Sequence, residues 1–179
     1  MNTEQGFGVW ITGLPSSGKS SVTRELVKKL KAQGIHIVVL ESDEMRKILT
    51  PEPTYSPEER DRFYRTLVLL GELLTRSGVN VIFDATANRR AYRDHARSLI
   101  QKFIEVYVDC PMEICRKRDP KGIYARAASG AAATVPGVHV SYEPPLEPEL
   151  TVDGQASPEV AAGIVVNKLK EFQYVKKSL

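Results

Sequence analysis

Eight consecutive residues, Gly13-Leu14-Pro15-Ser16-Ser17-Gly18-Lys19-Ser20, form a complete G-x-x-x-x-G-K-[ST] motif. An apolar run at residues 7–11 precedes the motif and predicts a buried strand. Residues 21–33 follow it and predict a helix, because their apolar side chains recur at helical spacing. A strand before and a helix after is the context in which this motif binds phosphate. The motif therefore predicts an α/β fold with an anion-binding loop after its first strand.

The residue types in this loop indicate which anion it binds. Gly13 and Gly18 let the chain turn back so that backbone N–H groups point inward. The helix that begins near Ser21 directs its positive dipole end at the same point. Lys19 adds a mobile charge for a β- or γ-phosphate, and the Ser20 hydroxyl suits Mg²⁺. We expect ATP and Mg²⁺ here; the alternative is a Gly/Ser loop that binds no ligand.

Composition limits the remaining possibilities. The chain has 179 residues, 42% hydrophobic and 26% charged, which is ordinary for one globular domain over residues 1–179. No apolar run is long enough to span a membrane and no signal peptide is evident, so we expect a cytoplasmic protein. A net charge of +3 does not indicate nucleic acid as a partner. Cys110 and Cys115 are expected to be small apolar residues rather than disulfide or zinc ligands.

Four further apolar runs, at residues 35–40, 79–83, 103–108 and 150–153, alternate with helical patterns. Alternation of this kind predicts a parallel sheet, here mostly five-stranded, with helices on both faces: the three-layer P-loop NTPase fold of nucleoside-kinase type. Glu41, Asp43 and Asp84 follow two of these strands, at the edge where such sheets bind ligands. They could hold Mg²⁺ through water or orient an attacking hydroxyl. Helix capping by Ser42 or Asp43, and a helix start at Asn88, are the structural alternatives.

Two more segments suggest a substrate site. Ser56-Pro57 predicts the start of a helix that runs to about residue 78, with an apolar stripe that includes Phe63. Arg60, Arg62 and Arg65 crowd its first turns, either to face an anionic substrate or to pair with nearby acids on a solvated face. Residues 119–148 are rich in Gly and Pro and show no clear helix or strand, which predicts a mobile lid or a substrate loop. A lid that closes would keep water from the reaction.

Several motifs together resemble the adenylylsulfate kinase family, and the likeness covers nearly the whole chain. They are the loop with its preceding Trp10-Ile11-Thr12, Arg46, residues 56–60, residues 105–108, Arg118-Asp119-Pro120-Lys121-Gly122-Ile123-Tyr124, and Tyr142-Glu143. The resemblance implies transfer of the γ-phosphate of ATP to the 3′-hydroxyl of adenosine 5′-phosphosulfate (APS), which gives PAPS and ADP. It also implies Mg²⁺ and a homodimer.

The resemblance assigns roles to individual residues. Arg46 and Arg60 match arginines that hold the phosphosulfate, Lys121 matches a lid lysine, and Arg118 matches a residue near the adenine of ATP. Paired arginines suit an acceptor with two oxyanion groups. Lys19, Glu41, Asp43 and Asp84 are the expected catalytic residues.

The sequence departs from the family pattern at four places. Glu41 replaces an aspartate, and Thr86-Ala87-Asn88 replaces Ile-Ser-Pro. Phe63 stands where the family has an asparagine, and Val135 where it has an aromatic that stacks on the substrate base. Losing a stacking ring and an amide weakens base recognition by about 1–3 kcal/mol each. Two alternatives therefore stay open: a kinase for another small phosphorylated nucleotide or sugar, and a nucleotide-binding module without turnover.

Overall fold

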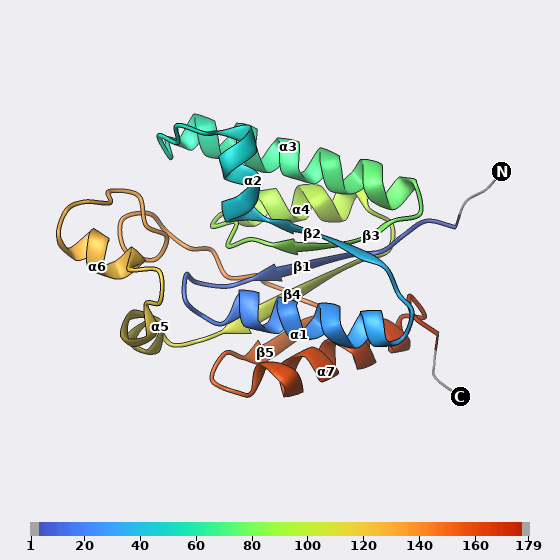
Figure 1. Cartoon of the computed structure of the whole chain (residues 1–179). Coiled ribbons are helices and arrows are strands. Elements are labelled where there is room, and N and C mark those ends of the chain that lie inside the picture. Colours follow the sequence, from blue (N-terminus) through green and yellow to red (C-terminus); the bar gives the residue numbers. More distant parts are fainter. Residues whose placement is uncertain (1–3, 177–179) are drawn as a thin grey trace.

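The computed structural model describes residues 4–176 and has a five-stranded parallel sheet at its centre (Figure 1). The strand order is β2-β3-β1-β4-β5, so the strand that leads into the phosphate loop is the central one. The strands are β1 (Gly8–Thr12), β2 (Ile37–Glu41), β3 (Asn80–Asp84), β4 (Phe103–Asp109) and β5 (Leu150–Asp153). The predicted fold class and all five predicted strands are confirmed, with ends that differ by one or two residues.

Seven helices are found among the described residues. They are α1 (Lys19–Ala32), α2 (Ser42–Leu49), α3 (Pro57–Arg76), α4 (Arg90–Leu99), α5 (Met112–Arg118), α6 (Ile123–Ala128) and α7 (Pro158–Glu171). Helix α3 begins as the sequence predicts, because the Ser56 hydroxyl accepts a hydrogen bond from the Glu59 N–H at 3.2 Å.

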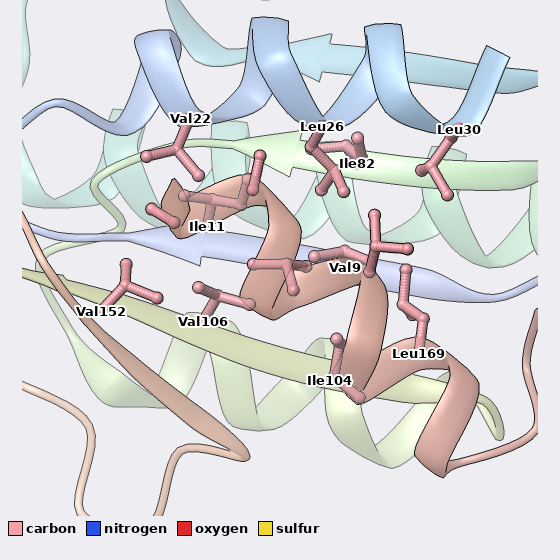
Figure 2. Close-up of a cluster of buried hydrophobic side chains, with 14 of the residues drawn as sticks. Val9, Ile11, Val22, Leu26, Leu30, Ile82, Ile104, Val106, Val152 and Leu169 are labelled. Atoms are coloured by element: carbon pink, nitrogen blue, oxygen red, sulfur yellow. The ribbon is translucent and has the colours of Figure 1, made fainter. Parts of the chain in front are cut away.

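Two apolar layers enclose the sheet. On one face, side chains from the strands pack against α1 and α7; the cluster includes Val9, Ile11, Leu26 and Leu169 (Figure 2). On the other face, Trp10 packs with residues of α3 and α4. The side chains of β1 alternate between these two clusters, and every residue of β1 is buried. Burial on both faces fixes the register of this strand and thereby the position of the loop that follows it.

The segment 119–148 differs from its prediction. It contains α6, which the Asp119 carboxylate caps by accepting hydrogen bonds from the N–H groups of Ile123 and Ala125, at 2.7 and 2.9 Å. It also shares a small apolar cluster with α5 and the phosphate loop, in which both free cysteines are buried. The expectation of a segment without any element is therefore wrong, and the expectation of apolar cysteines is confirmed. Among residues 4–176, no helix combines the length and the hydrophobicity that a membrane crossing requires.

Candidate active site

The phosphate loop lies between the end of β1 and the start of α1. Gly13 and Gly18 both have positive φ, +153° and +109°, and a Cβ at Gly13 would come within 2.6 Å of the Val108 carbonyl oxygen. Only glycine fits these two positions without strain. The turn is closed by a hydrogen bond from the Ser17 N–H to the Leu14 carbonyl at 3.1 Å. The sequence therefore forms the compact loop that its motif predicts.

Lys19 is the first residue of α1 and is 8% exposed. Its Nζ donates hydrogen bonds to the carbonyls of Gly13 at 3.0 Å and Leu14 at 2.7 Å. Burial lowers the pKa of Lys19 from 10.5 to about 8, opposed by the negative charge of Asp84. The ammonium is thus held against the backbone of the loop, and it loses its proton at a lower pH than an exposed lysine does.

Three carboxylates gather at the carboxyl ends of β2 and β3. Glu41 and Asp84 are paired across these strands, and Asp43 lies in the first turn of α2. Burial, with the neighbouring Asp84 charge, raises the pKa of Glu41. Burial also raises the pKa of Asp84, which Lys19 opposes. Glu41 is at the N-cap position of α2 and makes no side-chain cap, and Asp43 and Ser42 lie inside the helix, so capping does not explain these residues.

The donor set at this edge suits Mg²⁺. The Ser20 hydroxyl lies close enough to Asp84 to stabilise its charged form, and Mg²⁺ prefers such oxygen ligands. Within residues 4–176, no group of three or more His, Cys, Asp or Glu side chains is placed to hold a metal. A magnesium ion bound with ATP needs only one or two protein oxygens, because phosphates and water complete its shell. Ser20 and Asp84 therefore fit the group that the motif implies.

Two buried arginines lie at the same edge. Arg46 on α2 and Arg60 on α3 are each 8% exposed. Arg46 pairs with Glu59 at 3.2 Å, and its guanidinium carbon is 3.9 Å from the centre of the Phe63 ring. Arg60 donates to the Thr134 carbonyl at 2.5 Å. Of the three arginines early in α3, only Arg60 is buried, and Arg62 and Arg65 face solvent.

Sequence reasoning missed Tyr55, which lies beside both buried arginines. The guanidinium carbons of Arg46 and Arg60 are 5.0 and 5.7 Å from its ring centre. The ring is 39% exposed, and the backbone has φ +56°, unusual for a residue with a side chain. Its position between two prolines gave no periodic signal, although an aromatic next to an expected anion site was a clue.

Lys121 brings the 119–148 segment to the strand-end carboxylates. Its Nζ lies 2.5 Å from Asp43 Oδ2 and 3.6 Å from Glu41 Oε1. A second contact comes from Tyr124 on α6, whose hydroxyl donates to the Pro15 carbonyl at 2.9 Å. Figure 1 shows α5 and α6 at the end of the sheet where β1 runs into the phosphate loop. The segment therefore covers the edge at which the predicted site residues meet.

Arg118, at the end of α5, joins that helix to the phosphate loop. Its Nη1 donates to the Gly154 carbonyl at 2.7 Å and lies 3.5 Å from the Ser17 carbonyl oxygen. A Cβ at Gly154 would come within 2.6 Å of the same Ser17 oxygen. The turn after β5 therefore packs closely against the phosphate loop at Gly154, and Arg118 contacts both the turn and the loop.

Two predicted substrate residues lie in apolar clusters. Phe63 is 1% exposed and packs beneath Arg46, and Val135 is 5% exposed within the cluster of α5 and α6. Their roles toward a substrate stay predictions. Phe63 contacts Arg46, and Val135 directly follows Thr134, whose carbonyl accepts a hydrogen bond from Arg60. Asn88 is not a helix cap, because α4 begins at Arg90 with Arg89 at the N-cap position.

Comparison with known proteins agrees with this geometry. Residues 5–153 match the family model described as adenylylsulphate kinase. A probable adenylyl-sulfate kinase of Pyrococcus abyssi is 38% identical over 172 residues, which cover 96% of this chain and 99% of that protein. The adenylyl-sulfate kinase of Microcystis aeruginosa is also 38% identical, over 177 residues and 98% of each chain.

Solved structures give the same result. The Mycobacterium tuberculosis APS kinase, in complex with AMPPNP and APS, superposes with a TM-score of 0.88 at 34% identity; 93% of this chain and 98% of that chain are covered. A gluconokinase from Sinorhizobium meliloti 1021, at 18% identity and a TM-score of 0.62, shares the fold. With the family model matched over most of its length, the chain belongs to the adenylylsulfate kinase family.

Proposed function

We propose that this chain transfers the γ-phosphoryl group of ATP to the 3′-hydroxyl of APS, which gives PAPS and ADP and serves sulfate activation. The carrying observation is that a phosphate loop and two buried arginines lie at one edge of the sheet, in a member of this family. One element suits the phosphates of ATP, and the other suits a second ligand with its own anionic groups. The M. tuberculosis relative in complex with AMPPNP and APS supports this pairing.

Catalysis in this proposal is mostly alignment and neutralisation of charge. Residues Gly13 to Ser21 bind the phosphates, Lys19 follows the transferred group, and Arg118 lies on the nucleotide side. Ser20 and Asp84 would hold Mg²⁺, which supplies further neutralisation when bound. Asp43 is the most exposed of the three carboxylates and, with Glu41, is held by Lys121. We therefore propose that Asp43 accepts the proton of the acceptor hydroxyl.

The acceptor in this proposal is held by Arg46, Arg60 and Lys121. Phe63 acts on it through Arg46, and Val135 acts through the shape of the loop that carries Thr134. The changed base-reading positions favour a second candidate, a kinase for another small phosphorylated nucleotide or sugar. The homodimer and the cytoplasmic location also stay predictions; sedimentation velocity checks the first, because a dimer has twice the mass of the chain.

A coupled ADP-release assay with several acceptors separates the candidates. Release with APS, and not with cytidine nucleotides or simple sugars, supports the proposal. Release with another acceptor alone would support the second candidate. Binding of ATP without turnover of any acceptor would leave only a nucleotide-binding module.

Lys19→Ala serves as the loss-of-function variant in the same assay. We expect ADP release to fall at least a hundredfold, because the transferred group loses its compensating charge in a buried site. Activity that survives this substitution would argue against every kinase function for the chain.

A further inference from the structure

Arg93, on α4, is a buried arginine outside the phosphate-binding and acceptor-binding residues. It is 1% exposed, and its guanidinium makes three polar contacts. Nε donates to Glu105 Oε1 at 2.5 Å, one terminal nitrogen donates to the Ala87 carbonyl, and the other donates to the Glu143 carbonyl at 2.6 Å. Only the first partner is charged. The other two contacts hold the backbones of two segments that are more than fifty residues apart.

These two segments meet at the active-site edge. Residues 85–88 leave β3 directly after Asp84, and residues 141–143 are the returning end of the proposed lid. The Asn88 side chain donates to the Ser141 carbonyl at 3.0 Å, and the Glu143 N–H donates to the Asn88 carbonyl at 2.8 Å. Ala87, between Asp84 and Asn88, has φ +42°, a backbone conformation that surrounding contacts must maintain. We call the contact between residues 85–88 and residues 141–143 the joint. Arg93 lies across the joint and donates a hydrogen bond to each of the two segments.

The joint reaches the acceptor side through one side chain. Asn88 Oδ1 accepts a hydrogen bond from Arg60 at 3.4 Å, and Arg60 also donates to the lid carbonyl of Thr134. Arg60 Nε also donates to the Tyr55 carbonyl at 3.1 Å, so Asn88 is one of three groups that together set the direction of the Arg60 side chain. Asn88 directly follows Ala87, whose carbonyl Arg93 holds.

We propose that Arg93 is a positioning residue for acceptor binding, which fixes the 85–88 segment against the end of the lid so that Asn88 helps to orient Arg60. The inference rests on the proposed function only in that Arg60 holds the acceptor. A buried ion pair is weak evidence for stability, because an apolar pair of similar volume often serves as well. A planar guanidinium, in contrast, can donate to two carbonyls and a carboxylate at once, which an ammonium on a flexible stem does not reproduce.

The test compares Arg93→Lys and Arg93→Gln with the matched control Arg97→Gln. Arg97 lies one turn further along α4 and shares Glu105 as a partner, at 3.4 Å, but its other carboxylate partner is Glu149. Among the described residues, none of its hydrogen bonds reaches 85–88 or 141–143. Steady-state kinetics give KM for the acceptor and for ATP, and thermal unfolding gives Tm.

Both Arg93 variants are expected to raise the acceptor KM about tenfold and to leave the ATP KM within about twofold. Lysine is expected to rescue Tm more than it rescues the acceptor KM. Arg97→Gln is expected to lower Tm and leave both KM values unchanged. Equal KM values for the Arg93 variants and the wild type, with only Tm reduced, would overturn the proposal.

A double variant keeps the test decisive if Glu105, left with Arg97 at 3.4 Å, prevents folding. Arg93→Met with Glu105→Met removes both charges of the buried pair, and Arg97 keeps Glu149 as its partner. The folded double variant is expected to keep the raised acceptor KM, and a wild-type KM would refute the inference. If the wild type uses a different acceptor, the comparison is made with that acceptor. Failure of the proposed function is then seen in the wild type, and failure of this inference only in the variants.

Discussion

Lys19 combines two properties at the residue scale: it is the expected phosphate ligand and it is buried. Burial lowers its pKa to about 8, so its charge depends on pH just above neutrality. In the folded state the pKa is below its ordinary value of 10.5, so the buried ammonium disfavours folding below about pH 8. That penalty disappears as the pH rises from about 8 toward 10.5.

ATP affinity should change in the opposite sense, because the phosphates need the charged form. We predict that the affinity for ATP, at constant Mg²⁺, falls as the pH rises above about 8. Isothermal titration calorimetry between about pH 7.5 and about pH 9.5 measures this. Asp84→Asn removes a charge that raises the Lys19 pKa. The ATP affinity of this variant should therefore begin to fall at a lower pH than that of the wild type. An affinity that stays constant over this range in both proteins would contradict the prediction.

Phe63 shows how a residue absent from the site surface can act on it. Its ring centre lies 3.9 Å from the Arg46 guanidinium carbon. A desolvated contact of this kind contributes about 1–2 kcal/mol. We predict that Phe63→Leu raises the acceptor KM about fivefold and leaves the ATP KM unchanged, because leucine fills similar space without a ring face.

The control for Phe63→Leu is Phe103→Leu. Phe103 is 6% exposed and lies 5.2 Å from the Arg97 guanidinium, outside the acceptor residues. Both variants should lose about 1 kcal/mol of stability. A similar rise of the acceptor KM in both variants would mean that the effect comes from a general loss of core packing.

At the scale of elements, α6 is docked on the phosphate loop by a hydrogen bond and a small apolar cluster. The hydroxyl of Tyr124 donates to the Pro15 carbonyl, and Leu14 of the loop packs against the cluster that includes Tyr124 and Val135. We predict that Tyr124→Phe loosens this docking by about 1 kcal/mol, which increases opening about fivefold. Tryptic cleavage after Arg126 measures opening, and Tm should change little.

Tyr107→Phe is the control for that experiment. Its hydroxyl donates to Asp109 at 3.1 Å and does not join the 119–148 segment to the loop. Cleavage after Arg126 should therefore match the wild type. Equal cleavage in Tyr124→Phe and the wild type would show that this hydrogen bond does not hold α6 in place.

The elements also show what the sequence could predict. Strands β1 to β5 are apolar runs between helical patterns, so both their existence and their order along the chain could be predicted. Helix α6 could not, because six residues rich in alanine carry no apolar stripe, and its cap depends on Asp119 outside the helix. Short helices of this kind are fixed by tertiary contacts rather than by local pattern.

Some residues of the candidate site could likewise be predicted from the sequence, and others could not. The phosphate loop is contiguous, so its motif alone predicted it, and the carboxylates were predicted from their place after strands. Tyr55, Asn88 and Arg93 were not, because their roles depend on partners far away in sequence; Asn88 meets Ser141 across 53 positions. Such contacts exist only once the sheet has brought the segments together.

At the scale of the whole molecule, one parallel sheet places the phosphate loop, two buried arginines and a covering segment at a single edge. We propose above that the γ-phosphoryl group of ATP is transferred to the 3′-hydroxyl of APS at this edge, with release of ADP. The most direct measurement uses ATP radiolabelled at the γ-phosphate, with APS as acceptor and identification of the labelled product. The account predicts label on the 3′ oxygen of APS and its loss in Lys19→Ala. Label found only in inorganic phosphate, or only on a different acceptor, would contradict it.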